Sequence, residues 1–95
     1  MSAATIFSAA NADFTPQNGA LLRLDDPVVE DVGHYGRESA ARLARALTGG
    51  VPFTKDPKRK RFYEVSVDNE HFYIHVVPHT RKVLLLLHWF RQEAA

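Results

Sequence analysis

Apolar and polar residues alternate along three runs between Arg61 and Phe90, which read FYEVSV, HFYIHVV and KVLLLLHWF. The runs are rich in β-branched and aromatic residues, a composition that favours strands over a helix. They are separated by Asp68-Asn69 and by His79-Thr80, with Pro78 marking the second break, and these residue types favour turns. The pattern predicts a C-terminal meander of three antiparallel strands.

Two-residue loops at both turns fix which residues of the meander face one another. Across the first turn Ser66 pairs with His71, and across the second Val76 pairs with Val83. Because side chains alternate along a strand, both registers place apolar residues on one common face. We expect this face to form the core with Tyr63, Val65, Val67, Phe72, Ile74, Val76, Val83, Leu85, Leu87 and Trp89. The helix residues predicted to cover it are Val32, Leu43 and Leu47.

The opposite face of the predicted meander is mixed: Phe62, Glu64, Ser66, His71, Tyr73, His75, Leu84, Leu86, His88 and Phe90. The same counting places His71 beside His88 on the neighbouring strand, and Tyr73 beside Glu64. A face in full contact with water would not need the leucines and phenylalanines. We therefore expect this face to be partly covered or to serve as a binding surface.

A helix is predicted upstream of the meander. Asp25-Asp26-Pro27 is typical of a helix start, and apolar residues then recur at helical spacing. Gly33 and Gly36 predict a kink or a split into two helices. The helix is uninterrupted from Arg37 to Leu47, and Gly49-Gly50 ends it.

The fold expected from these elements is α+β, with one main helix packed on an antiparallel β-sheet. Residues 1–20 are predicted to be either a mobile tail or an edge strand. Ala20 to Leu24 is predicted to be a short edge strand or a lead-in to the core, and Val51 to Lys60 a loop with two prolines. No repeat or second domain is recognisable, so residues 1–95 are predicted to form a single small domain.

Composition narrows the function classes. With no cysteine among its 95 residues, the chain has no disulfide framework, no thiolate zinc site and no cysteine nucleophile, which fits a reducing cytoplasm. The start of the chain lacks the basic residues and apolar run of a signal peptide. The longest apolar run, Val83 to Leu87, is far shorter than the ~20 residues that span a bilayer. We expect a cytoplasmic protein without membrane contact.

Four residues of the mixed face are the candidate catalytic residues: His71, Tyr73, His88 and Glu64. Two histidines beside a carboxylate and a phenol suit general acid–base catalysis near neutral pH. The alternative is that they are ordinary polar residues of amphipathic strands, half covered by the tail or by a partner. His71 and His88 could also share an ion across the strands. No third ligand beyond Glu64 is evident, so neither a metal nor another cofactor is predicted.

Basic residues cluster beside the predicted strands. They are Lys58, Arg59, Lys60 and Arg61 before the first strand, and Arg81 and Lys82 in the second turn. Cations next to aromatic and histidine side chains suit the binding of RNA, with its phosphate backbone and its bases to stack. Against this, eleven acidic residues balance twelve basic ones, for a net charge of +1, and such loops are usually just solvated.

An open sheet edge, or the apolar residues of the mixed face, would instead allow strand addition or apolar docking of another protein chain. The sequence therefore supports two hypotheses. One is a small nucleic-acid-directed protein that uses the mixed face and the basic cluster. The other is a non-catalytic protein-interaction module that forms a homodimer or a heterocomplex through its sheet.

The C-terminal half of the chain contains KDPKRKRFYEVSVDNEHFYIHVV followed by KVLLLLHWFRQ. This pattern resembles the RelE/ParE superfamily of small bacterial toxins. In that family a basic loop enters a strand with alternating apolar residues, and a tight turn leads to a strand that opens with a basic residue. An aliphatic strand then closes on a polar or basic end. Here His71 falls near the family's strand arginine, and His88-Trp89-Phe90-Arg91 offers a similar end.

The resemblance implies a toxin that either cleaves RNA on the ribosome or poisons gyrase, neutralised by an antitoxin that wraps its surface. For the first activity it implies a metal-independent endoribonuclease. Lysine and arginine side chains would neutralise phosphate there, while His71, Tyr73 or His88 helped a 2′-hydroxyl attack its neighbour.

Overall fold

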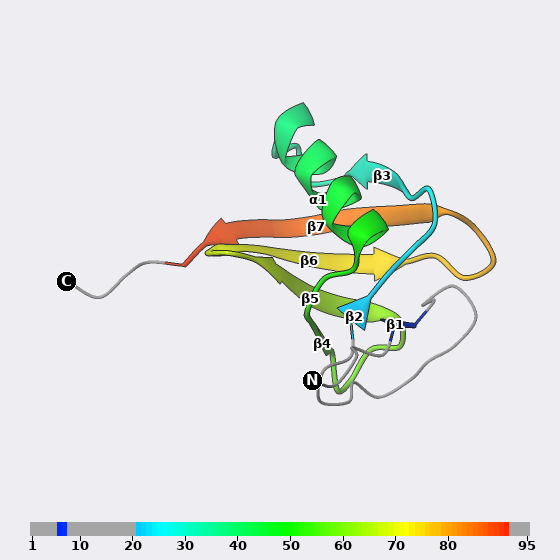
Figure 1. The fold of residues 1–95 in the computed structure, drawn as a ribbon. Helices are drawn as coiled ribbons and strands as arrows, with labels where there is room; N and C mark the ends of the chain where they lie inside the picture. The colour runs from blue at the N-terminus through cyan, green and yellow to red at the C-terminus, as the bar shows by residue number, and fades with distance from the viewer. Residues whose placement is uncertain (1–5, 8–20, 92–95) are drawn as a thin grey trace.

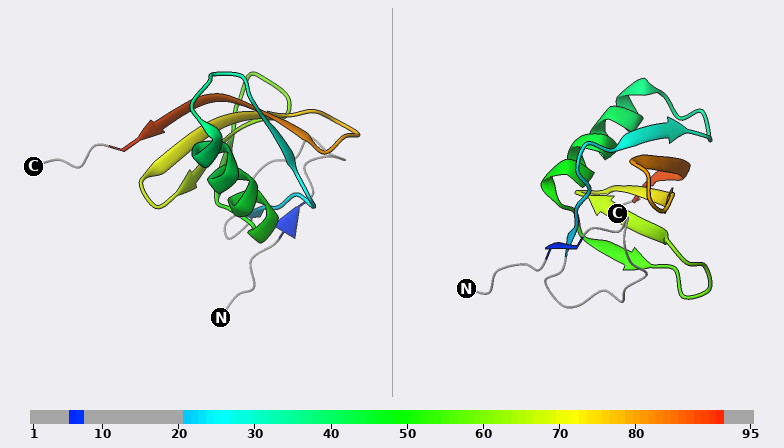
Figure 2. Two further views of the ribbon diagram at one scale, coloured as in Figure 1. Left: turned by 90° about the horizontal axis from the view of Figure 1, so that it is seen from above. Right: turned by 90° about the vertical axis from the view of Figure 1, so that its right-hand side faces the viewer.

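The computed structural model describes residues 6–7 and 21–91 and shows one helix packed against a mixed sheet of five strands (Figure 1). The strands of this sheet lie in the order β3-β7-β6-β5-β4. Their bounds are Val28–Asp31 for β3, Phe53–Lys55 for β4, Phe62–Val67 for β5, Glu70–Val76 for β6 and Lys82–Phe90 for β7. The helix α1 spans Arg37–Gly49 and lies over one face of the sheet, the helix face (Figure 2). We call the other face the outer face.

The α+β class and the meander β5-β6-β7 are confirmed, whereas the sheet is not purely antiparallel. β3 runs parallel to β7, with Asp31 opposite Leu85, and occupies one edge of the sheet. The predicted helix start at Asp25-Asp26-Pro27 is therefore wrong. Val28 and Val29 are β-branched, and their preference for a strand outweighs the helix-start pattern before them.

The helix begins only after Gly36, whose φ of 117° lies in the region that favours glycine. Asp31 at the end of β3 accepts hydrogen bonds from the amides of Tyr35 (2.9 Å) and Gly36 (2.8 Å), which fixes the turn between strand and helix. These bonds hold the pKa of Asp31 below its usual value. α1 then buries Leu43 and Leu47 in the core, which confirms the predicted helix.

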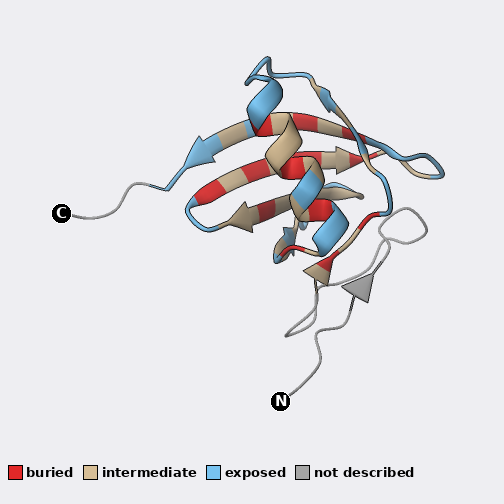
Figure 3. Cartoon of the chain, turned by 45° about the horizontal axis from the view of Figure 1, so that its top comes forward, coloured by how far each residue is buried: buried red, intermediate tan, exposed pale blue. Residues whose placement is uncertain are grey.

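The core lies between α1 and the sheet, and its buried residues are red in Figure 3. The predicted core residues that are buried are Tyr63, Val65, Phe72, Ile74, Val76, Val83 and Leu85, and Val67 packs against them partly buried. Leu22 and Val51 also belong to the core and are joined by two backbone hydrogen bonds. Val32, which was predicted to cover the core, is 44% exposed, because it lies in the turn after β3 and not on a helix.

A bulge in β7 departs from the predicted register. Ile74 pairs with Leu85, but the preceding residue of β6, Tyr73, pairs with Leu87, which leaves Leu86 as an extra residue. Because side chains alternate along a strand, the extra residue exchanges the faces of all that follow. Leu87 (52% exposed) and Trp89 (39%) were therefore wrongly predicted for the core. Both lie exposed on the outer face.

Of two connecting segments, one differs from the prediction and the other agrees with it. Val51 to Lys60 is not a loop throughout, because β4 lies within it and pairs antiparallel with β5 at the second edge of the sheet. The turn between β5 and β6 is the predicted Asp68-Asn69, with Asp68 at a φ of 54°.

Within residues 1–20, only Ile6–Phe7 (β1) is described, and it pairs in parallel with Leu21–Leu22 (β2) as a separate two-stranded sheet. The rest of the prediction for residues 1–20 lies outside the described residues. None of the helical structure in the described part of the chain is long and apolar enough to cross a membrane.

Candidate functional site

The outer face presents three rows of side chains across the meander, and no helix formed by the described residues lies over it (Figure 2). From the end that adjoins the loop between β4 and β5, the rows are Phe62–His75–Leu84, Glu64–Tyr73–Leu87 and Ser66–His71–Trp89. Three of the four candidate catalytic residues therefore lie together on this face: Glu64, His71 and Tyr73.

His71 is the centre of the third row. Its Nδ1 shares a hydrogen bond with Ser66 Oγ at 2.9 Å, and Glu64 Oε2 lies 3.6 Å from the same nitrogen. The His71 ring stacks on the indole of Trp89, with ring centroids 5.4 Å apart and planes 12° from parallel. A hydroxyl, a carboxylate and an aromatic ring thus fix the orientation of this imidazole.

The first row joins the aromatic part of the outer face to the basic cluster. Phe62 and His75 stack with centroids 4.3 Å apart. His75 Nδ1 donates a hydrogen bond to the carbonyl oxygen of Arg61 (3.1 Å), so this nitrogen carries a proton. The guanidinium of Arg59 lies 5.4 Å from the centroid of the Phe62 ring, within the range of a cation–π contact.

Tyr73 in the middle row makes the shortest polar contact of the outer face. Its hydroxyl donates to Asp56 Oδ2 at 2.5 Å, while Asp56 Oδ1 accepts from the amides of Lys58 (2.8 Å) and Arg59 (3.2 Å). Burial and then the bond to Asp56 raise the pKa of Tyr73. The Tyr73 bond and then the Lys58 amide lower the pKa of Asp56. At neutral pH the Tyr73 phenol therefore keeps its proton and the Asp56 carboxyl is ionised.

A pocket of about 180 Å³, open to solvent, lies beside this pair and is lined by Thr54, Lys55, Asp56, Pro57, Glu64 and Tyr73. Glu64 was predicted as a site residue, and its side chain is 45% exposed. Asp56 was not predicted, because its role depends on β4, which the sequence analysis took for a loop. The pocket brings two carboxylates from different elements to one place.

Of the six predicted nucleic-acid-binding residues, Lys58, Arg59 and Lys60 are exposed in the loop between β4 and β5. Lys58 and Lys60 form no ion pair with any residue that the structure describes. Arg61 follows in the turn directly before β5, half-buried, with a φ of 62°. We refer to residues 58–61 as the basic loop.

The two other predicted cations, Arg81 and Lys82, lie at the same end of the sheet, in the turn between β6 and β7 and at the start of β7. Arg81 forms an ion pair with Asp26, and Lys82 Nζ lies 3.6 Å from Glu30 Oε1. These carboxylates offset both charges. The positive charge that remains open to a ligand at this end is therefore concentrated in the basic loop.

His88 does not lie beside His71, so the predicted neighbour pair is wrong. The bulge at Leu86 pairs His71 with Trp89 instead, and the two imidazoles lie on opposite faces of the sheet. On the helix face His88 Nε2 donates to Glu70 Oε2 at 2.6 Å, because a carboxylate only accepts. The two histidines of the predicted acid–base pair are not brought together.

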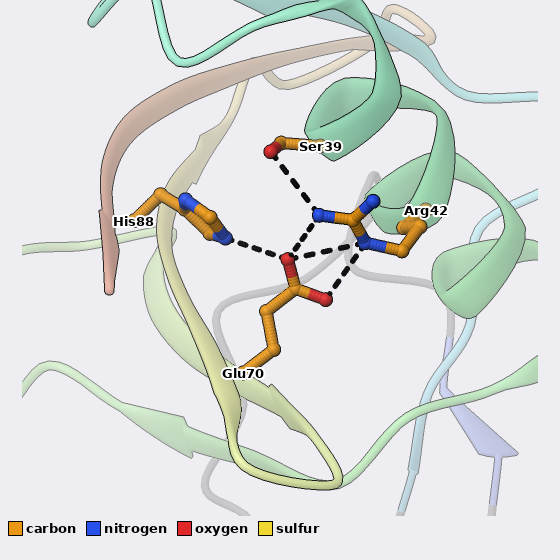
Figure 4. Close-up of polar contacts among 4 residues, drawn as sticks. All are labelled: Ser39, Arg42, Glu70 and His88. Carbon is orange, nitrogen blue, oxygen red and sulfur yellow. Dashed lines mark hydrogen bonds and ion pairs between the residues drawn. The ribbon is translucent and has the colours of Figure 1, made fainter. Parts of the chain in front are cut away.

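Glu70 joins His88 to the helix in a partly buried network (Figure 4). Arg42 of α1 donates from Nε to Glu70 Oε1 (2.9 Å) and from Nη2 to Oε2 (2.7 Å), and it also reaches Ser39 Oγ at 3.3 Å. The Glu70 side chain is only 7% exposed. The bond from Arg42 and that from His88 lower the pKa of Glu70 although burial opposes them, so Glu70 is ionised in the folded chain.

The sequence analysis missed this network, although the alternation in β6 indicates part of it. Glu70 shares the parity of Phe72 and Ile74, which places its carboxylate on the core face, where it needs a partner. His88 could not have been chosen as that partner, because only the bulge turns it toward the helix.

Comparison with known proteins shows no match to a protein family, to a curated protein or to a solved structure. The resemblance to RelE/ParE toxins stays a prediction from the residues quoted above. Among the residues that the structure describes, no group of three or more histidine, aspartate or glutamate side chains could hold a metal ion.

Proposed function

We propose that the outer face binds single-stranded RNA. The main support is the position of two stacked ring pairs, Phe62–His75 and His71–Trp89, on one sheet face that adjoins the basic loop. Unpaired bases stack on aromatic side chains of such open sheets whatever their sequence. The phosphates of the same strand need cations close by, and the basic loop supplies them.

The spacing of the rows suits a short stretch of RNA. Successive rows on one face are ~6.7 Å apart along the strands, so the two ring pairs are separated by ~13 Å. A few nucleotides in extended form cover this distance. Each base stacked on an aromatic ring contributes ~1–3 kcal/mol, and Trp89 is 39% exposed and within reach of such a base.

The proposal concerns binding, and cleavage would be a further step. Glu64, His71 and Tyr73 lie within the proposed RNA-binding face, whereas His88 lies behind it. A toxin-like ribonuclease would therefore have to work with His71, held by Ser66, in place of a His71–His88 pair. Turnover of RNA by the parent chain and its absence in His71→Ala would support that step.

Binding is tested by fluorescence anisotropy of a labelled RNA octamer at several salt concentrations. The double variant Lys58→Ala/Lys60→Ala should bind several-fold more weakly. The slope of log K against log salt should fall by about 1.4, because each phosphate contact on a single strand contributes ~0.7.

The matched control is Arg37→Ala/Arg45→Ala, which removes two exposed positive charges from α1, on the other side of the sheet. This variant should bind as the parent does. Equal losses in both double variants would mean attraction by net charge alone, and an absence of saturable binding to the parent would exclude the proposal.

A second candidate, the protein-interaction module, is favoured by two large apolar residues that β7 exposes on the outer face, Leu87 (52% exposed) and Trp89 (39%). Phe90 (55% exposed), which was predicted for the same face, lies instead on the helix face, opposite Glu70. Exposed apolar side chains in a cluster are typical of docking surfaces. If a second copy of the chain docks there, sedimentation equilibrium should show a fraction of dimer that increases with protein concentration. Leu87→Lys should abolish it, while the equally exposed Val28→Lys on β3 should not. A strict monomer would exclude the homodimer.

A further inference from the structure

Three of the side chains that line the pocket offer hydrogen-bond acceptors to a ligand: Asp56, Glu64 and Tyr73. The Tyr73 hydroxyl donates its one hydrogen bond to Asp56, so toward a ligand its oxygen can act only as an acceptor. Asp56 and Glu64 are carboxylates, which accept and do not donate. Lys55 also lines the pocket and brings a positive charge to it. The preference for N–H donors is therefore a property of Glu64, Asp56 and Tyr73, which attract such donors, and not of the pocket's net charge. The ligand chemistry is therefore that of an amino or amide N–H edge.

The two carboxylates differ in what they have left to offer. Asp56 already accepts three hydrogen bonds, from the Tyr73 hydroxyl and from the amides of Lys58 and Arg59. Glu64 is 45% exposed, and its carboxylate lies no closer than 3.6 Å to His71 Nδ1. Glu64 is thus the group that can bind a ligand with both oxygens, and Asp56 holds Tyr73 in place.

The position of the pocket relates it to the RNA-binding face. Glu64 and Tyr73 belong to the middle row, and Asp56 is followed by Pro57 and then by the basic loop. The Tyr73 ring also packs against Phe62 of the first row, with centroids 5.8 Å apart. A nucleotide whose base stacks at the first row can therefore turn its edge toward the pocket while its phosphate stays at the basic loop.

We propose that this pocket reads the base of one nucleotide and that Glu64 selects guanine. Guanine presents two adjacent N–H donors on its Watson–Crick edge, which match the two oxygens of one carboxylate. Adenine and cytosine offer one amino group beside a ring-nitrogen acceptor. Uracil offers a single N–H between two carbonyl oxygens, which the carboxylates repel. The expected order is guanine first, then adenine and cytosine, then uracil.

This inference rests on the proposed RNA binding, and one experiment separates the two. Labelled uridine octamers that carry a single central guanine, adenine, cytosine or uracil are titrated into the full chain. The guanine octamer should bind about tenfold more tightly than the all-uracil one, since a well-placed bidentate pair discriminates by ~1–3 kcal/mol. Competition with unlabelled octamers should give the same order.

Glu64→Gln tests the residue itself, because it keeps the shape of the side chain but replaces one acceptor by a donor. The variant should lose the preference for guanine and bind the all-uracil octamer as well as the parent does or better. Glu38→Gln, on the exposed part of α1, is the matched control and should keep the preference.

Three outcomes are possible, and each decides something. Equal binding of all four octamers, weakened by Lys58→Ala/Lys60→Ala, would overturn the guanine proposal and leave the RNA-binding proposal standing. A guanine preference that survives in Glu64→Gln would overturn the role of Glu64. No binding of any octamer would exclude RNA binding and guanine selection together.

Discussion

Glu70 connects more parts of the fold than any other polar side chain described above. Its own strand is β6, Arg42 reaches it from α1, and His88 reaches it from β7. A buried carboxylate is tolerated only when such partners replace the water that it has lost. The bidentate contact with the guanidinium also fixes the rotation of α1 about its axis, because only one helix residue can present its side chain at that place.

Removal of the Glu70 carboxylate should therefore destabilise the chain. In Glu70→Ala the Arg42 guanidinium and the His88 imidazole lose their common acceptor beside a cavity. Breaking a buried pair in this way costs ~3–5 kcal/mol, and we expect about 2–3 kcal/mol here because Arg42 is partly exposed. Urea unfolding followed by circular dichroism gives the value. Glu38→Ala, on the exposed side of the same helix, should change stability by less than ~0.5 kcal/mol. Equal effects of the two variants would contradict the structural role of Glu70.

The first hairpin shows what the sequence can predict at the level of single residues. The turn Asp68-Asn69 fixes the register, and the pairs Ser66–His71 and Glu64–Tyr73 follow from it by counting. Counting along the sequence is thus enough to place three of the four candidate catalytic residues on the same face. Their contacts with the β4–β5 loop, above all that of Tyr73 with Asp56, depend on the tertiary fold and could not be derived by counting residues.

At the level of elements, the sequence analysis failed where short-range preferences compete. The bulge at Leu86 falls within a run of four leucines, and any of these fits either face of a sheet. No polar residue in the run shows where the alternation changes, so regular counting exchanged the positions of His88 and Trp89. β4 is three residues long and follows a proline, so its strand character comes from pairing with β5 and not from its own composition.

The strand β3 is a second case of this kind. Asp25-Asp26-Pro27 is a good start for a helix, and the apolar spacing after it suits a helix as well. Parallel pairing with β7 is a contact between residues more than fifty positions apart, and no local pattern reveals it. The same Asp31 that ends the strand then binds two amides of the turn before α1. The sequence thus predicts the helix itself but not the strand that leads into it.

Across the whole molecule, three carboxylates hold separate parts of the fold together. Asp31 fixes the turn between β3 and α1, Asp56 holds the start of the basic loop to Tyr73, and Glu70 joins the helix to the sheet. Each accepts several hydrogen bonds as an anion, and in each case the main cause of its lowered pKa is one of these bonds. The fold as a whole therefore depends on their ionisation.

Acid should accordingly unfold the chain. A carboxyl whose pKa is lower in the folded chain than in the unfolded one binds its proton more weakly when folded, so protonation favours unfolding. The stabilisation is complete when the pH lies above the usual pKa values, 3.8 for aspartate and 4.5 for glutamate. It is lost as the pH falls through the lower pKa values of the folded chain. The urea midpoint should be constant from about pH 7 to pH 5 as far as these groups determine it, and it should fall below pH 4.5.

Comparison of variants assigns this acid sensitivity to particular groups. Glu70→Gln cannot gain a proton at position 70, so its urea midpoint, although lower at pH 7, should fall less steeply between pH 4.5 and pH 3 than that of the parent. Asp56→Asn should act in the same way at the lower end of that range, because the usual pKa of aspartate is lower. Glu38→Gln should follow the parent curve throughout. If all three variants followed it, the lowered pKa values of Glu70 and Asp56 would not determine the acid stability, and repulsion among the positive charges that remain at low pH would be its cause.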